Sequence, residues 1–173
     1  AAAGQGLGER ITGGGDGVVR MSFPARPGVE ICADGFRLFG DGTRTRGGSW
    51  NKASCAPGPV TVEVRIRDGK VQDVDVLDRD EPRAPAAREM GSVDAAEAAS
   101  FLLSVARGAP ARRGVAEAIL PALMADVPDA WREVLRIAED RQVDPGVRRT
   151  ALFGGGQEAA EAATQGLAEV ASD

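Results

Sequence analysis

The first half of the chain alternates between apolar and polar residues, as β-strands do. In VVRMSF (18–23), Val19, Met21 and Phe23 fall on one face, and the same period of two runs through VTVEVRIRDGKVQDVDVL (60–77). Shorter apolar runs between residues 31 and 50 are separated by turns rich in glycine and aspartate. The pattern predicts a β-rich segment over 18–77.

The clearest element in this segment is a hairpin within residues 60–77. A two-residue loop, 68–69, would set Val62 opposite Asp75, whereas a three-residue loop, 67–69, sets Val62 opposite Val74. A shift of one residue in register turns a strand's side chains to the other face. The sequence therefore favours the three-residue loop, with its glycine in the left-handed conformation.

Two segments show neither the strand period nor the helix period. Residues 1–17 contain seven glycines and almost no apolar side chains, which is typical of a flexible arm. Residues 78–91, DRDEPRAPAAREMG, are charged and contain proline, so they are predicted to form a linker. The predicted order is an arm, the β-rich segment 18–77, a linker, and a helical domain over 92–173.

The helical domain is predicted from apolar stripes at helical spacing. Ser92 is expected to cap a first helix that runs to about Arg107. A second helix is expected over about 111–125, kinked at Pro121, and a third over about 129–141 with Trp131 on its buried stripe. Short connections between these helices favour antiparallel packing of neighbours.

The stretch VDPGVRRTALFGGGQ (143–157) predicts a fourth helix. Asp144 is placed to cap it and Pro145 to occupy its first position, with Val147, Ala151 and Leu152 on the inner face. The three glycines of 154–156 are expected to end the helix, and a fifth helix is predicted over about 158–170. A phosphate-binding loop is not favoured, because such glycines lie between a strand and a helix rather than after a helix.

This stretch, with the amphipathic segment DAWREVLRIAEDR (129–141) before it, resembles a HEAT repeat. The second helix of that repeat commonly begins Asp-Pro-x-Val-Arg, and the matching positions are Asp144, Pro145, Val147, Arg148, Ala151 and Leu152. The resemblance covers at most 93–173 and implies that Leu152 and Leu135 share a core with Val147 and Ala151, and that Arg148 pairs with Asp144 or Asp129. The glycine triplet departs from the repeat pattern. The whole layout is similar to exported bacterial proteins with a cysteine-containing β segment before a HEAT-like helical array, and the expected fold class is α+β.

Composition and charge exclude several classes of function. The chain has no histidine, which excludes Ser-His-Asp and Cys-His catalysis and imidazole metal ligands. The net charge is −5, and residues 93–173 carry the imbalance, whereas a duplex-binding surface needs clustered Lys and Arg. Nucleic acid is therefore not an expected partner, and no apolar run approaches the length of a membrane span.

The two cysteines, Cys32 and Cys55, indicate the compartment. They lie in a turn-rich segment and outside any Cys-x-x-Cys motif, so a disulfide between them is favoured over a pair of buried thiols. A disulfide is typical of an oxidising compartment. The chain begins with three alanines and no methionine, as a mature protein does after signal-peptide cleavage. We therefore expect an exported protein, periplasmic, cell-surface or extracellular.

Candidate site residues are few. Arg44 and Arg46 lie in a glycine-rich loop that could hold a carboxylate or phosphate, and Trp50 beside Cys55 is a candidate surface anchor. A calcium site is weighed for the acidic residues Asp73, Asp75, Asp78, Asp80 and Glu81, but a solvated strand face and linker is favoured. No catalytic residue, metal ligand or cofactor is predicted.

Three functions follow from these observations. The leading hypothesis is a non-enzymatic exported module that binds another protein, a second copy of the chain included. The alternative is a structural subunit of an extracellular or cell-surface filament or lattice, joined to its neighbour through the N-terminal arm. A hydrolase with a carboxylate pair ranks last, because only the abundance of Asp and Glu supports it.

Overall fold

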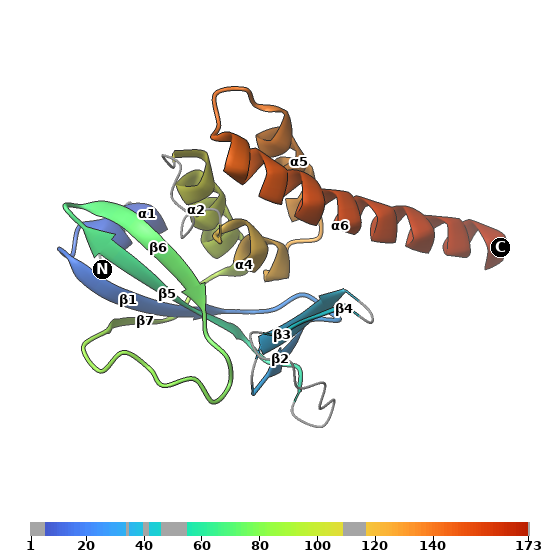
Figure 1. Cartoon of the computed structure of the whole chain (residues 1–173). Coiled ribbons are helices and arrows are strands. Elements are labelled where there is room, and N and C mark those ends of the chain that lie inside the picture. The colour runs from blue at the N-terminus through green and yellow to red at the C-terminus, as the bar shows by residue number, and fades with distance from the viewer. Residues whose placement is uncertain (1–5, 34, 40–41, 46–54, 109–116, 173) are drawn as a thin grey trace.

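The structure is a computed structural model that describes residues 6–33, 35–39, 42–45, 55–108 and 117–172. The larger sheet has the strand order β6 (Lys70–Val76), β5 (Val60–Arg67), β1 (Gly17–Phe23) and β7 (Arg88–Ser92). The smaller sheet consists of β2 (Glu30–Cys32), β3 (Gly35–Phe39) and β4 (Gly42–Thr45). Helices pack on one face of the larger sheet, and side chains from both form one continuous core (Figure 1). The predicted α+β fold class is confirmed.

The alternation read from the sequence determines the two faces of the larger sheet. β1 and β5 are antiparallel, with Met21 opposite Val62 and Phe23 opposite Val60. All the apolar positions of this alternation are at most 2% exposed: Val19, Met21, Phe23, Val60, Val62, Val64 and Ile66. The strand period in the sequence is therefore the period of core burial.

The hairpin loop between β5 and β6 differs from the prediction. The turn has two residues, Asp68 and Gly69, with φ of 53° and 66°, the left-handed values of a type I′ turn. Gln72 forms a bulge on β6, so Val62 lies opposite Val76 and Val64 opposite Val74, whereas the prediction paired Val62 with Val74. The predicted three-residue loop is wrong, because the bulge restores the pairing of apolar with apolar residues that the longer loop was invoked to explain.

The predicted flexible arm, residues 1–17, contains a short helix, α1 (Leu7–Thr12). Leu7 and Ile11, four residues apart on one side of this helix, are 4% and 0% exposed. Asp16 accepts the two backbone N–H groups of the β5–β6 turn at 2.9 and 3.1 Å, and these hydrogen bonds hold its pKa below the ordinary value. The arm prediction is wrong for the described residues, which pack on their own chain.

The predicted linker, 78–91, supplies an edge strand, because β7 pairs with β1 in parallel. Arg20 of β1 is only 6% exposed on the sheet face opposite the helices. Its guanidinium contacts Glu63 at 2.5 Å, pairs with Glu89 of β7, and donates to the carbonyl of Ala84 at 2.9 Å. The hydrogen bonds that Arg20 donates to Glu63 raise the pKa of Arg20. The charges of this segment therefore hold it against the sheet, which the linker prediction did not anticipate.

Three helices follow β7: α2 (Ala95–Gly108), α4 (Ile119–Met124) and α5 (Ala130–Glu139). Ser92 belongs to β7, and Asp94 caps α2 by accepting the N–H groups of Ala96 and Glu97, both at 3.0 Å. Pro121 lies in the first turn of α4, where its missing N–H costs little, so the predicted kink is wrong. Residues 111–116 of the predicted second helix lie outside the described residues, and residues 117–118 form a turn.

The buried side of α5 carries Val134 and Ile137, both fully buried. Trp131 is half-buried and packs against the core, as predicted. The guanidinium of Arg132 lies 4.6 Å from the centre of the Trp131 ring.

The last helix, α6 (Pro145–Ser172), begins as predicted. The Asp144 carboxylate accepts the N–H groups of Gly146 at 2.8 Å and Val147 at 3.3 Å. Arg148 does not follow the prediction: its Nε donates to the carbonyl of Ala138 at 3.1 Å, and no ion pair joins it to Asp144 or Asp129 in the described part of the chain. Arg148 therefore links the first turns of α6 to the end of α5.

The glycines of 154–156 do not end α6, which continues as one helix of 28 residues. A Cβ on Gly154 would lie 2.9 Å from Leu123 Cδ1 of α4, and one on Gly155 would lie 2.9 Å from Leu135 Cδ2 of α5. These distances are shorter than van der Waals contact. The first two glycines let α6 cross α4 and α5 closely, so the predicted break and the separate fifth helix are wrong.

Leu152, placed on the inner face by the sequence, is 62% exposed. Val147 and Ala151 are buried as predicted, but Leu152 lies about 100° further around the helix. The predicted core shared by Leu152 and Leu135 is therefore wrong. The large loss of stability expected from removing a buried leucine does not apply at position 152.

Candidate functional site

The structure joins two of the residues singled out in the sequence and leaves the others untested. Cys32 and Cys55 form a disulfide, as predicted, with an S–S distance of 2.01 Å. Arg44 lies in β4, but its side chain is outside the described part of the structure, and Arg46 and Trp50 are outside it altogether. The roles predicted for Arg44, Arg46 and Trp50 stay sequence predictions.

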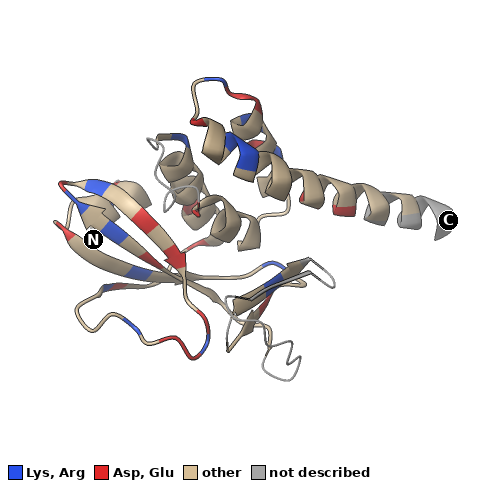
Figure 2. Cartoon of the chain, in the orientation of Figure 1, with Lys and Arg blue, Asp and Glu red and all other residues tan. Residues whose placement is uncertain are grey.

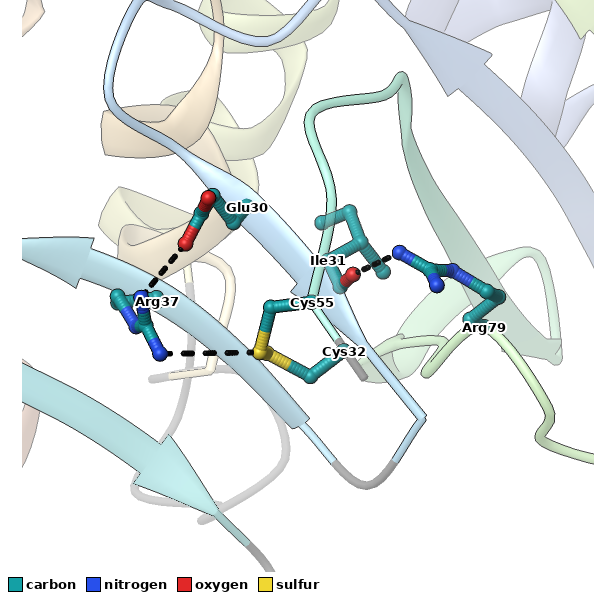
Figure 3. Close-up of a disulfide and its surroundings, with 6 residues drawn as sticks. All are labelled: Glu30, Ile31, Cys32, Arg37, Cys55 and Arg79. Carbon is teal, nitrogen blue, oxygen red and sulfur yellow. Dashed lines mark hydrogen bonds and ion pairs between the residues drawn. A yellow bond between two sulfur atoms is a disulfide. The ribbon is translucent and has the colours of Figure 1, made fainter. Parts of the chain in front are cut away.

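The disulfide is surrounded by arginines that support the fold (Figure 3). Arg37 donates to Glu30 at 2.8 Å and lies 4.0 Å from the Cys55 sulfur. Arg79 donates to the carbonyl of Ile31 at 2.7 Å, next to Cys32. The cross-link and these contacts fasten β2 to the chain segments on either side of β5 and β6.

A cleft of about 240 Å³ lies where α6 crosses the connection that follows β1. Its polar walls are Arg26 from that connection, Asp126 from the connection after α4, and Glu158 and Glu161 from α6. Its apolar walls include Trp131 of α5. Arg26 donates to the carbonyl of Leu123 at 2.9 Å and also forms an ion pair with Glu158. Arg26 therefore connects the sheet, α4 and α6.

Glu158 is the one residue of this cleft with a strongly shifted pKa among the described groups. Its side chain is 9% exposed, and burial raises its pKa to about 7, with Arg26 opposing the shift and the neighbouring Glu161 adding to it. Glu161 Oε2 is buried without a hydrogen-bond partner among the described residues. The described lining contains no serine, threonine, cysteine or lysine, so it offers no side-chain nucleophile of these types.

The opposite side of α6 is apolar and open to solvent. We define the outer face of α6 as seven residues: Leu152, Phe153, Gly156, Ala159, Ala160, Ala163 and Leu167. Leu152, Phe153 and Leu167 are 62%, 57% and 71% exposed and are the large apolar side chains most exposed in the described structure. At 100° per residue the seven positions fall within an arc of about 120°.

The charges of α6 lie on the other side. Between 152 and 167 the charged residues are Glu158 and Glu161, and both line the cleft beneath the helix. In Figure 2 the projecting part of α6 that is not drawn in grey is mostly tan, in contrast to the charged strands of the larger sheet. A surface helix normally turns its charged side to water and its apolar side inward. Over these residues α6 does the reverse, which is typical of a face that a partner covers.

Sequence reasoning missed both the cleft and the outer face. The cleft joins Arg26 to Glu158 across 132 positions of sequence, and no local pattern indicates such a contact. The outer face had a signal, because Phe153, Ala160 and Leu167 recur at intervals of seven. This spacing was not recognised as one helix face, because the glycines of 154–156 were interpreted as a helix end.

Neither a membrane-spanning helix nor a metal site is found among the described residues. No helix in the described ranges combines the length and the hydropathy that a bilayer span requires. No group of three or more acidic or cysteine side chains in those ranges is arranged to hold a metal ion, and this includes the acidic residues of 73–81.

Comparisons with known proteins identify no relative: no family model, curated protein or solved structure matches the chain.

Proposed function

We propose that the chain is a non-enzymatic exported interaction module that binds a protein partner through the outer face of α6. The observation that carries this proposal is the inverted amphipathicity of residues 152–167, with apolar side chains in solvent and carboxylates beneath. Figure 1 shows the C-terminal half of α6 extending beyond the rest of the molecule, where a partner can reach it. Helices with such faces bind proteins by packing apolar side chains into a complementary surface.

Two further observations support the class and compartment. The absence of histidine removes the commonest general base, and the cleft at Glu158 adds none of the usual side-chain nucleophiles among its described residues. The Cys32–Cys55 disulfide is typical of proteins in oxidising compartments. The alternative, an assembly joined through the N-terminal arm, is not favoured by residues 7–17, which pack on their own chain.

A peptide selection tests the interaction surface without a known partner. The purified chain is panned against a random peptide library, and each selected peptide is titrated against wild type, Phe153→Glu and Leu167→Glu. Because a buried interface anchor contributes about 2 kcal/mol or more, we expect these variants to weaken binding by about 30-fold or more.

Gln142→Glu is the matched control, since it adds the same single negative charge at an exposed position between α5 and α6. It should leave affinity within about twofold. Selected peptides that bind all four proteins equally would show that the binding surface lies elsewhere and would contradict the proposal.

A further inference from the structure

We infer that the partner of the outer face is a second copy of this chain, bound antiparallel with Ala160 at the centre of the contact. This inference rests on the proposed function and specifies its partner. It is carried by the distribution of large and small residues along the face and by the placement of charge.

The outer face has a large side chain at each end and small residues between them. Phe153 lies seven positions before Ala160, and Leu167 lies seven positions after it. A two-fold axis at Ala160 places Phe153 of one copy beside Leu167 of the other at both ends of the contact. The residues between them are mainly small, so the two helix axes can approach closely at the centre.

Charge permits the same occupant at the contact itself. Each chain has a net charge of −5, so two copies repel one another at long range, and a contact between them must not bury carboxylates as well. Glu158 and Glu161 point to the cleft on the inner side of α6, and the outer face brings no charged residue of 152–167 into the contact. Two such faces therefore meet without burying an unpaired charge.

The shape of the molecule leaves room for this pairing. α6 packs on α5 through Val147, Ala151 and Gly155, which are buried on its inner side. Its second half projects beyond the body (Figure 1), so an antiparallel neighbour lies along the outside of the helix. The face from 152 to 167 is about 23 Å long, which is short for an interface. We therefore expect a weak dimer, with a dissociation constant of about 1–100 µM.

Sedimentation velocity over a range of protein concentration measures the dimer. The average mass should rise from 17.9 kDa toward twice that value as concentration increases. Leu167→Glu should weaken association by about 10-fold or more, because it places a charge in the apolar contact. Gln157→Glu adds the same charge about 100° from the centre of the face and should change the dissociation constant by less than about threefold. Leu167 is highly exposed, so its substitution leaves the core intact.

Cysteine cross-linking distinguishes the direction of pairing. In the antiparallel dimer, Ala160→Cys faces its own copy and should form an intermolecular disulfide on mild oxidation, while Phe153→Cys, about 21 Å from its copy, should not. Equal cross-linking at both positions would indicate parallel helices and overturn the inference. A wild-type chain that stays monomeric at about 300 µM would also overturn it. The peptide selection reports separately whether the face binds other proteins.

Discussion

Gly155→Ala is expected to destabilise the fold by about 1–3 kcal/mol, although alanine is the better helix former. The added methyl group would lie 2.9 Å from Leu135 Cδ2, 3.1 Å from Leu135 Cγ and 3.2 Å from Val134 Cγ1. Because two atoms of one side chain and a buried valine are involved, α5 and α6 must separate or Leu135 must change rotamer. Urea unfolding at low protein concentration measures the loss.

Gly156→Ala is the matched control, one residue further along the same helix. A Cβ at Gly156 meets nothing within 4 Å, so only the conformational preference changes. This variant should be more stable than wild type by about 0.5–1 kcal/mol. Equal stabilisation by both substitutions would show that Gly155 is not a packing contact, and the close crossing of α5 and α6 would have to be abandoned.

Glu158→Gln is expected to reduce the change of the unfolding free energy with pH by about 1–3 kcal/mol. The pKa of Glu158 is raised to about 7 in the fold by burial, from an ordinary value of 4.5. Since the unfolded chain loses this proton first, the contribution of Glu158 to stability is full below about pH 4.5. It falls as pH rises and is lost above about pH 7. The wild type should therefore lose more stability than Glu158→Gln between pH 5 and 8.

Urea unfolding at several pH values in this range gives the difference between the two curves. The control is Glu139→Gln, which removes a carboxylate from an exposed position on α5 and should leave the wild-type slope unchanged. Parallel curves for wild type and Glu158→Gln would mean that the carboxyl is not buried where α6 crosses Arg26. The change in slope is the test, because glutamine can still accept a hydrogen bond from Arg26.

Local patterns in the sequence predicted the elements whose determinants are local. The alternation of Val60, Val62 and Val64 with polar residues appears as a buried strand face, and Asp144 with Pro145 begins α6. The pairing of Cys32 with Cys55 was also predicted. The pleat of a strand and a helix cap depend on nearby residues, so residue type and spacing are enough to predict them. The cysteine pairing was predictable for another reason, because two cysteines allow one intramolecular pairing.

Two of the errors come from contacts between segments far apart in the chain. Residues 78–91 have the composition of a linker, yet β7 pairs with β1, where Arg20 supplies a counter-charge for Glu89. The glycines of 154–156 have the composition of a helix end, yet Leu123 and Leu135 use the missing side chains for close packing. Glycine gives the same local signal in both roles, and only the neighbouring helices distinguish them.

The continuity of α6 underlies both the proposed surface and its partner, because a break at 154–156 would separate Phe153 from Leu167 on different helices. Amide hydrogen exchange followed by NMR tests this continuity residue by residue. We expect the amides of 154–158 to be protected to the same degree as those of 149–151, as in one uninterrupted helix. Unprotected amides at 154–157 between two protected segments would contradict the account, since the outer face would not exist as a single surface.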